Sequence, residues 1–204
     1  MLLIGVNRSP YTRRVAITLA IYGVPFEQRG LSGFDNREDV RARNPLGRIP
    51  ALVLDDGETL LDSGAIIDYL DETYGGDHPL TPRAGAERRG VLKVTALLMG
   101  ACDKLLHAAY ERNRRPSEKL HQPWIDDCVA QATHALAAVE AMIDTSKPFL
   151  LLGRLTQADV SAVVTERLAR AGLGIDTDRE MPQLRALTSR LSEQPAFRAS
   201  EPER

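Results

Sequence analysis

A serine hydroxyl stands where the sequence predicts that a helix begins. Ser9 is followed by Pro10, an order typical of a helix N-cap and the first helical residue. In one interpretation the serine is only a cap. In the other it does chemistry, because the unpaired N–H groups and the dipole of a helix N-terminus favour an anion. A thiolate would be stabilised at this position.

Two further pairs of residues stand at the starts of predicted elements. Ile49-Pro50 precedes a predicted strand, where a proline is tolerated because the missing N–H costs little. A trans proline would only mark a boundary, whereas a cis bond would turn the Ile49 backbone outward to pair with an extended peptide-like ligand. Asp62-Ser63 begins a predicted helix. It is either an ordinary cap or a carboxylate and hydroxyl that bind an amino-acid-like ligand.

The elements that position these residues fill the first 75 or so residues. The pattern predicts the order β-α-β, a weakly structured segment, then β-β-α, with Asp55-Asp56-Gly57 forming a tight hairpin turn. Strands are predicted at Leu2–Val6, Phe26–Arg29, Ala51–Leu54 and Glu58–Leu61, helices at Pro10–Tyr22 and from Asp62 to Gly75, and a helical turn at Glu38–Arg43. This order is expected to place the three candidate loops at one end of the sheet.

The remainder of the chain has helical periodicity. Residues 77–85 contain Pro79 and Pro82 and are predicted to link a domain of residues 1–76 to an all-helical domain of residues 86–204. Two long amphipathic helices are expected before Pro116 and before Pro148. A third helix is expected after the capping box Thr156–Asp159 and a fourth at Pro182–Gln194, with a frayed end after Pro195.

Composition excludes several classes of function. The 204 residues carry 26 basic and 28 acidic side chains, a net charge of −2, which does not favour nucleic acid or anionic membranes as partners. No apolar run approaches the ~20 residues of a membrane helix. Cys102 and Cys128 lie in helical apolar patterns without nearby ligands, so they are predicted to be buried thiols rather than a metal site. A cytoplasmic protein is expected.

Four motifs in order carry a family resemblance. They are Arg8–Val15 (RSPYTRRV), Asn44–Leu52 (NPLGRIPAL), Leu61–Leu70 (LDSGAIIDYL) and the capping box Thr156–Asp159. The chain resembles a cytosolic glutathione transferase of bacterial type, with the Ser-Pro-Phe/Tyr motif of the serine-type, tau-like members. The resemblance covers the whole chain. It implies a thioredoxin-like N-terminal domain, an all-α C-terminal helical bundle, and a homodimer with glutathione as cosubstrate and no metal.

The resemblance also implies a role for each site residue. Ser9 is the catalytic hydroxyl, which hydrogen-bonds the glutathione sulfur. Ile49 precedes a cis Pro50 and pairs through its backbone with the cysteinyl moiety. Asp62 and Ser63 hold the γ-glutamyl end, although Asp62 is shorter than the Glu or Gln of many members. Arg48 falls where some members bind the glycyl carboxylate.

The expected reaction is addition of the glutathione thiolate to an electrophile, as in detoxification, or reduction of a peroxide. No cysteine lies near position 9, and the Ser-Ser-Cys stretch of the maleylacetoacetate isomerase type is missing, which favours this transferase or peroxidase chemistry. A glutathione-dependent disulfide reductase and a non-catalytic ligand-binding module are the alternatives.

The electrophile pocket is assigned to four residues. Tyr11 lies beside Ser9, while His107, Tyr110 and Arg114 follow i, i+3, i+7 on one face of the first long helix. Alternatively, His107, Tyr110 and Arg114 form only a polar, solvent-exposed stripe on this helix.

Overall fold

The computed structural model describes residues 1–202 and divides into two compact units. The first unit contains Met1–Thr81 together with the chain from Ser192 onward, and the second contains Pro82–Leu191. The predicted linker is therefore divided, because its residues up to Thr81 group with the first unit.

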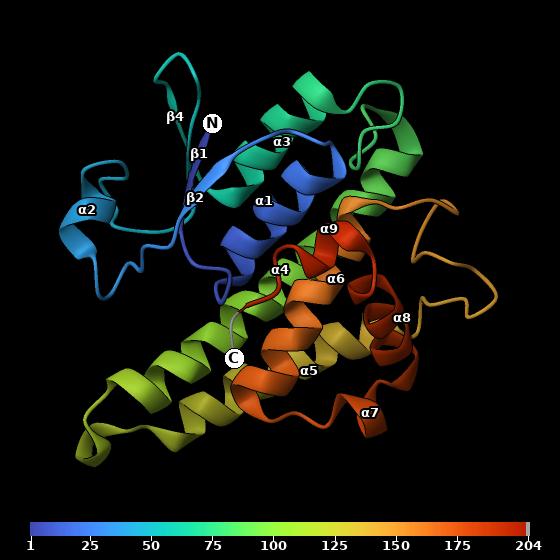
Figure 1. Cartoon of the computed structure of the whole chain (residues 1–204). Coiled ribbons are helices and arrows are strands. Elements are labelled where there is room, and N and C mark those ends of the chain that lie inside the picture. The colour runs from blue at the N-terminus through green and yellow to red at the C-terminus, as the bar shows by residue number, and fades with distance from the viewer. Residues whose placement is uncertain (203–204) are drawn as a thin grey trace. The chain divides into compact units, whose positions relative to one another are not determined.

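The first unit is a four-stranded mixed sheet with helices, labelled in Figure 1. The strand order is β2-β1-β3-β4, with β1 parallel to β2 and antiparallel to β3, and β3 antiparallel to β4. The strands are β1 (Leu2–Ile4), β2 (Glu27–Arg29), β3 (Ala51–Val53) and β4 (Thr59–Leu61), and the helices are α1 (Pro10–Ile21), α2 (Arg37–Arg41), α3 (Ser63–Tyr74) and α9 (Pro195–Arg198). The expected thioredoxin-like fold is confirmed.

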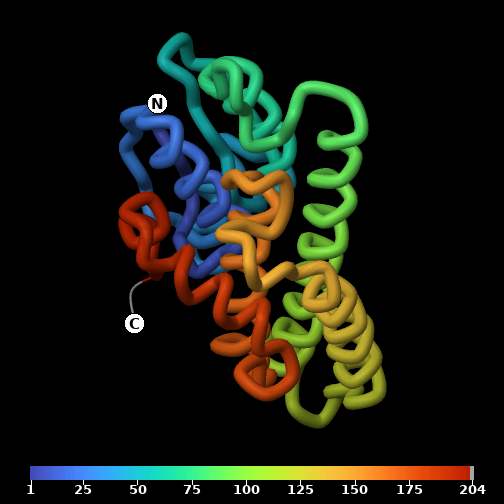
Figure 2. Tube along the Cα trace, turned by 90° about the vertical axis from the view of Figure 1, so that its right-hand side faces the viewer, coloured from blue at the N-terminus to red at the C-terminus, as the bar shows by residue number. Residues whose placement is uncertain are grey.

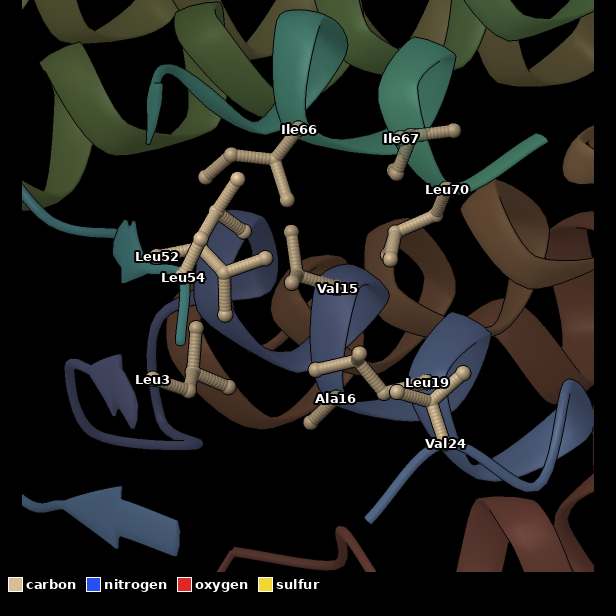
Figure 3. Close-up of a cluster of buried hydrophobic side chains, with 10 residues drawn as sticks. All are labelled: Leu3, Val15, Ala16, Leu19, Val24, Leu52, Leu54, Ile66, Ile67 and Leu70. Atoms are coloured by element: carbon tan, nitrogen blue, oxygen red, sulfur yellow. The ribbon is translucent and has the colours of Figure 1, made fainter. Parts of the chain in front are cut away.

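Apolar side chains from the sheet and from two helices form the core of this unit. Leu3 and Leu52 come from the paired strands β1 and β3, and both are fully buried. Figure 3 shows them beside Val15 of α1 and Ile66 of α3 in one cluster. Helices α1 and α3 pack against each other as well. The cluster holds α1 and α3 against the sheet, and Ser9 and Asp62 lie at the starts of these two helices.

The C-terminal segment differs from the expected frayed end. Pro195 begins the short helix α9, whose Phe197 is fully buried. Helix α9 packs against α1, so this segment belongs with the first unit rather than with the helical domain, as the sequence analysis had it. The burial of one large aromatic side chain explains why the segment is held.

The second unit is entirely helical. Helices α4 (Gly85–Arg114) and α5 (Gln122–Glu140) are the two long helices expected, and both views show them side by side (Figures 1 and 2). The remaining elements are a 3-10 turn η1 (Ser117–Lys119), α6 (Gln157–Arg167), a π-helical turn η2 (Leu168–Gly172), α7 (Thr177–Glu180) and α8 (Pro182–Ser192). Cys102 and Cys128 are buried free thiols, as predicted.

The capping box predicted at Thr156 begins α6. The Asp159 carboxylate accepts hydrogen bonds from the N–H and hydroxyl of Thr156, both at 2.9 Å, and from the N–H of Leu150 at 2.8 Å. Every residue from Gln157 to Glu166 is buried. Because all sides of α6 are covered, its buried polar groups at the N-terminus need these partners inside the protein.

None of the helices among residues 1–202 is both long and apolar enough to span a membrane.

Candidate functional site

The strand register brings the three candidate loops to one end of the sheet. Ile4, the last residue of β1, pairs with Ala51 at the start of β3, and Ala51 pairs with Leu61 at the end of β4. The chain after Ile4 leads to Ser9, the chain before Ala51 contains Ile49-Pro50, and Asp62 follows Leu61 directly. The arrangement expected from the element order is therefore present in the structure.

Ser9 is the N-cap of α1 and is partly exposed. Its Oγ accepts the N–H of Thr12 at 3.4 Å, a long hydrogen bond, and its backbone oxygen accepts the N–H of Arg13 at 2.9 Å. Accepting a bond leaves the hydroxyl proton available to a further acceptor. The first turn of α1 contains no acidic residue, so an anion beside Ser9 meets the positive end of the helix without a competing carboxylate.

Gly5 allows the Ser9 turn and the Ile49 loop to approach each other. Its φ is +142°, and a Cβ placed on it would lie 2.4 Å from the Thr12 Oγ1 and 3.2 Å from the Ile49 Cβ. Thr12 is fully buried, and its Oγ1 has no hydrogen-bond partner within the described chain. Any side chain at position 5 would force the two loops apart.

The Ile49–Pro50 peptide bond is cis, as the resemblance implied. Buried Asn44 shapes the turn before it: its Nδ2 donates to the Arg48 oxygen at 2.7 Å and its Oδ1 accepts from the Leu46 N–H at 3.1 Å. Within residues 1–202 the Ile49 N–H and C=O make no backbone hydrogen bond. The backbone of Ile49 is therefore able to pair with an added extended chain. Arg48 is exposed.

Asp62 has an unusual backbone conformation at the start of α3. Its φ is 68° and its ψ is 137°, a region that non-glycine residues rarely occupy. Its Oδ1 accepts the N–H of Gly64 at 2.7 Å, and the side chain is exposed. Ser63 is only 3% exposed, so little of its surface is open to a ligand. The exposed Asp62 carboxylate is therefore the part of this loop that a ligand can reach.

The candidate electrophile-site residues lie in both units. Tyr11 is partly exposed in α1, whereas His107, Tyr110 and Arg114 are exposed on α4. The His107 ring lies 6.3 Å from the ring of Trp124 in α5, measured between centroids. Lys104 Nζ lies 5.7 Å from the same indole. Trp124, which the sequence analysis did not single out, is thus a neighbour of His107.

Sequence reasoning also missed Gly5, Asn44 and the buried contact that Thr12 makes beside Gly5. Asn44 stands in a quoted motif, and its position two residues before Leu46 is typical of a side chain that hydrogen-bonds a turn. No comparable local signal exists for Gly5 or Thr12, because their contact depends on the crossing of separate segments. Among residues 1–202 no group of three or more His, Cys, Asp or Glu is arranged to hold a metal ion.

Comparison with known proteins agrees with this arrangement. Residues 3–78 match the family model for the glutathione S-transferase N-terminal domain. A maleylacetoacetate isomerase of Pseudomonas aeruginosa is 34% identical, with 96% of this chain and 92% of the relative covered. A solved glutathione transferase family member of Pseudomonas fluorescens Pf-5, with bound glutathione, is 30% identical over 100% of this chain and 99% of that one, with a TM-score of 0.87. The chain belongs to the glutathione S-transferase family.

A second solved glutathione S-transferase has the same fold. It comes from Methylobacterium radiotolerans, is in complex with glutathione sulfonate, and is 27% identical with a TM-score of 0.91. The alignment covers 100% of this chain and 95% of that chain. The N-terminal family match covers residues 3–78, so all three candidate loops lie within the matched domain.

Proposed function

We propose that this protein is a glutathione transferase of the serine type, with the site at Ser9, Ile49-Pro50 and Asp62-Ser63. The observation that carries the proposal is the strand register, which brings an N-cap hydroxyl, an unpaired backbone segment and an exposed carboxylate to one end of the sheet. A γ-glutamyl tripeptide offers complementary groups: a thiol, an extended backbone and an amino-acid end. Glutathione is the proposed cosubstrate.

The chemistry proposed for this site is ionisation of the bound thiol. A free thiol has a pKa of about 8.5, and lowering it by two units requires about 2.7 kcal/mol of preferential binding to the thiolate. One hydrogen bond to a charged acceptor contributes about 1.5–3 kcal/mol. The Ser9 hydroxyl and the N-terminus of α1 are together sufficient. The thiolate then attacks an electrophilic carbon or a peroxide oxygen.

The rest of the site orients the tripeptide. The Ile49 N–H and C=O pair with the cysteinyl backbone, and the exposed Asp62 carboxylate binds the ammonium of the γ-glutamyl end. Arg48 is proposed to face the glycyl carboxylate, although its exposed position makes its contribution small. Tyr11, His107, Tyr110 and Arg114 stay candidates for the electrophile.

Isomerisation is the second candidate activity. A full-length relative named maleylacetoacetate isomerase is 34% identical to this chain. A bound thiolate adds to a conjugated double bond, the resulting single bond rotates, and the thiolate leaves again. This sequence converts a cis double bond to trans without consuming glutathione. Against it, Pro10 and Tyr11 follow Ser9 where the isomerase type has Ser-Ser-Cys.

Two binding measurements and a panel of substrates test the proposed function. Calorimetry should detect glutathione binding, and an ultraviolet difference spectrum should show thiolate absorbance near neutral pH. A panel of aryl halides, hydroperoxides, mixed disulfides and maleylacetoacetate then assigns the reaction, with consumption of glutathione separating transfer from isomerisation. Binding with an unperturbed thiol and no turnover would mean a non-catalytic ligand-binding module.

A homodimer in the cytoplasm is proposed as the working form. Leu92, Ala96 and Gly100 lie at i, i+4, i+8 on α4, and all three are exposed, which suits close approach of a second copy. Ala101 and Ala108, two further small residues of α4, are buried in the helical unit and are not available to a second copy. A monomeric mass by sedimentation at micromolar concentration would contradict the proposal, and Leu92→Arg should convert a dimer to monomers.

A further inference from the structure

The side chain of Asn44 makes two hydrogen bonds within the turn that precedes Ile49. Its Nδ2 donates to the Arg48 oxygen at 2.7 Å, and its Oδ1 accepts the Leu46 N–H at 3.1 Å. Only 3% of Asn44 is exposed. Exchanging the amide oxygen and nitrogen would set donor against donor and acceptor against acceptor, so the two bonds assign the amide in one orientation. The donor of Asn44 is therefore directed at the Arg48 carbonyl.

The backbone of Asn44 is fixed as well. Its N–H donates to the oxygen of Val40 in α2 at 2.8 Å, and its oxygen accepts the Gly47 N–H at 2.7 Å. Val40 is fully buried and anchors this end of α2. A residue held by four hydrogen bonds loses little further conformational freedom when a ligand binds. Asn44 therefore holds the Arg48 carbonyl in one direction before any ligand arrives.

The direction of the Arg48 carbonyl determines the direction of the Ile49 N–H. The two groups belong to one peptide unit, which is planar and trans, so they point to opposite sides of the chain. Because the carbonyl faces the buried Asn44 amide, the N–H faces away from it. Ile49 is partly exposed, and its N–H makes no backbone hydrogen bond within residues 1–202. The strand register places this donor at the same end of the sheet as Ser9.

The bond from Asn44 also makes the Ile49 N–H a stronger donor. A peptide carbonyl that accepts a hydrogen bond is more polarised, and hydrogen bonds arranged in a chain strengthen one another. With a ligand bound, the chain runs from the Asn44 amide through the Arg48–Ile49 peptide to an acceptor on the ligand. A carbonyl oxygen of an extended peptide is the acceptor that matches a backbone N–H.

We propose that Asn44 is a positioning residue that orients the Ile49 N–H toward the cysteinyl carbonyl of glutathione. The inference rests on the proposed function, because it requires glutathione bound along Ile49. Asn44 itself does not touch the ligand. Its effect is on glutathione affinity, whereas ionisation of the thiol depends on Ser9.

The first test removes the Asn44 donor and keeps the acceptor. Asn44→Asp retains an oxygen for the Leu46 N–H, and at about pH 8 its carboxylate has no proton to donate to the Arg48 oxygen. Calorimetry should show glutathione affinity about tenfold weaker. The matched control is Asn36→Asp, because Asn36 Oδ1 accepts the Ser32 N–H at 3.1 Å in the same segment. The control should bind glutathione like the wild type, and the thiol pKa of bound glutathione should agree between the two variants within a few tenths of a unit.

A second ligand separates orientation of this N–H from a general effect on the loop. The alkene isostere of the cysteinyl–glycyl peptide bond keeps the shape of glutathione and has no carbonyl oxygen at that position. Asn44→Asp should bind the isostere as well as the wild type does, because the interaction that Asn44 supports is already missing. An equal loss of affinity for glutathione and for the isostere would make Asn44 purely structural and would overturn the inference, as would unchanged glutathione affinity in folded Asn44→Asp.

If Asn44→Asp does not fold, nuclear magnetic resonance of the wild type decides. Because one peptide unit joins the two hydrogen bonds, the side-chain amide resonances of Asn44 should shift when glutathione binds and should not shift with the isostere. Equal shifts with both ligands, or none with either, would overturn the inference. A wild type that does not bind glutathione would defeat the proposed function. Glutathione binding and turnover without these effects of Asn44 would defeat this inference alone.

Discussion

At the scale of single residues, Ser9 combines a structural and a proposed chemical role, and replacement by alanine separates them. Loss of the cap costs at most ~1 kcal/mol of stability, because the hydrogen bond to Thr12 is long at 3.4 Å. Loss of the hydroxyl donor should slow thiolate reactions roughly ten- to a hundred-fold and raise the bound thiol pKa by one to two units. Turnover and thiol pKa are measured at a temperature where Ser9→Ala is folded. Retained activity would show that Ser9 is only a cap and would make the partly exposed Tyr11 the next candidate, because Thr12 is fully buried.

Asp62 is the second residue that combines two roles, as the cap of α3 and as a proposed negative charge for the ligand, and a substitution can separate them. Asp62→Asn keeps an oxygen for the Gly64 N–H, now at 2.7 Å, but loses the negative charge. Stability should change by less than ~0.5 kcal/mol, whereas glutathione affinity should fall about tenfold because a charge-assisted bond to the ligand ammonium is lost. Calorimetry with glutathione and with a derivative lacking the γ-glutamyl amine checks this. An equal loss of affinity for both ligands would contradict the amine contact.

At the scale of elements, the meeting of β1, α1 and the loop before β3 depends on Gly5. Gly5→Ala should destabilise the protein by about 2–4 kcal/mol, because its φ of +142° disfavours a side chain and the added Cβ would clash with Thr12 Oγ1 at 2.4 Å. Gly23→Ala is the matched control: its φ is +64°, and nothing lies within 4 Å of the added Cβ. Denaturant unfolding of both measures the difference. Equal losses would show that the close approach carries no cost.

At the scale of the whole molecule, a buried carboxylate holds the end of the first unit. Asp71 of α3 is 5% exposed and accepts hydrogen bonds from the Tyr22 hydroxyl and, at 3.0 Å, from the Thr81 N–H. The Tyr22 oxygen in turn accepts the Leu80 N–H at 2.8 Å. Burial raises the pKa of Asp71 above its usual 3.8, although these hydrogen bonds oppose the change. The chain up to Thr81 is tied to α1 and α3 by this network.

The raised pKa of Asp71 predicts how its contribution to stability depends on pH. Below the unfolded-state pKa the Asp71 carboxyl is protonated in both the folded and the unfolded state. Its contribution to the free energy of unfolding is then at its largest. As pH rises through the folded-state pKa, the folded protein must carry a buried charge, and that stability is lost. Asp71→Asn does not ionise, and its amide can donate to Tyr22 while its oxygen accepts from Thr81.

The stability of Asp71→Asn relative to the wild type should therefore be higher at pH 7 than at pH 4. Urea unfolding at both values measures it, with Asp68→Asn on the exposed face of α3 as the control. A relative stability that is greater at pH 4 would reverse the sign and contradict the prediction.

The sequence alone was sufficient for features that depend on a few neighbouring residues. The cap at Ser9, the hairpin turn at Asp55–Gly57 and the capping box at Thr156–Asp159 each involve groups no more than four positions apart, so local rules predict them. The family resemblance, rather than local physics, predicted the cis bond at Ile49-Pro50. The site loops could be placed at one end of the sheet because element order restricts strand pairing.

Only the tertiary structure decided the features that depend on residues far apart in the chain. The approach of Thr12 and Ile49 across Gly5, the burial of Arg13, and the packing of α9 against α1 leave no periodic or local signal in the sequence. Each results from packing between segments whose separation along the chain is too large for any local pattern to encode. The same physics explains the division of the predicted linker at Thr81, because the bond to Asp71 joins residues ten positions apart.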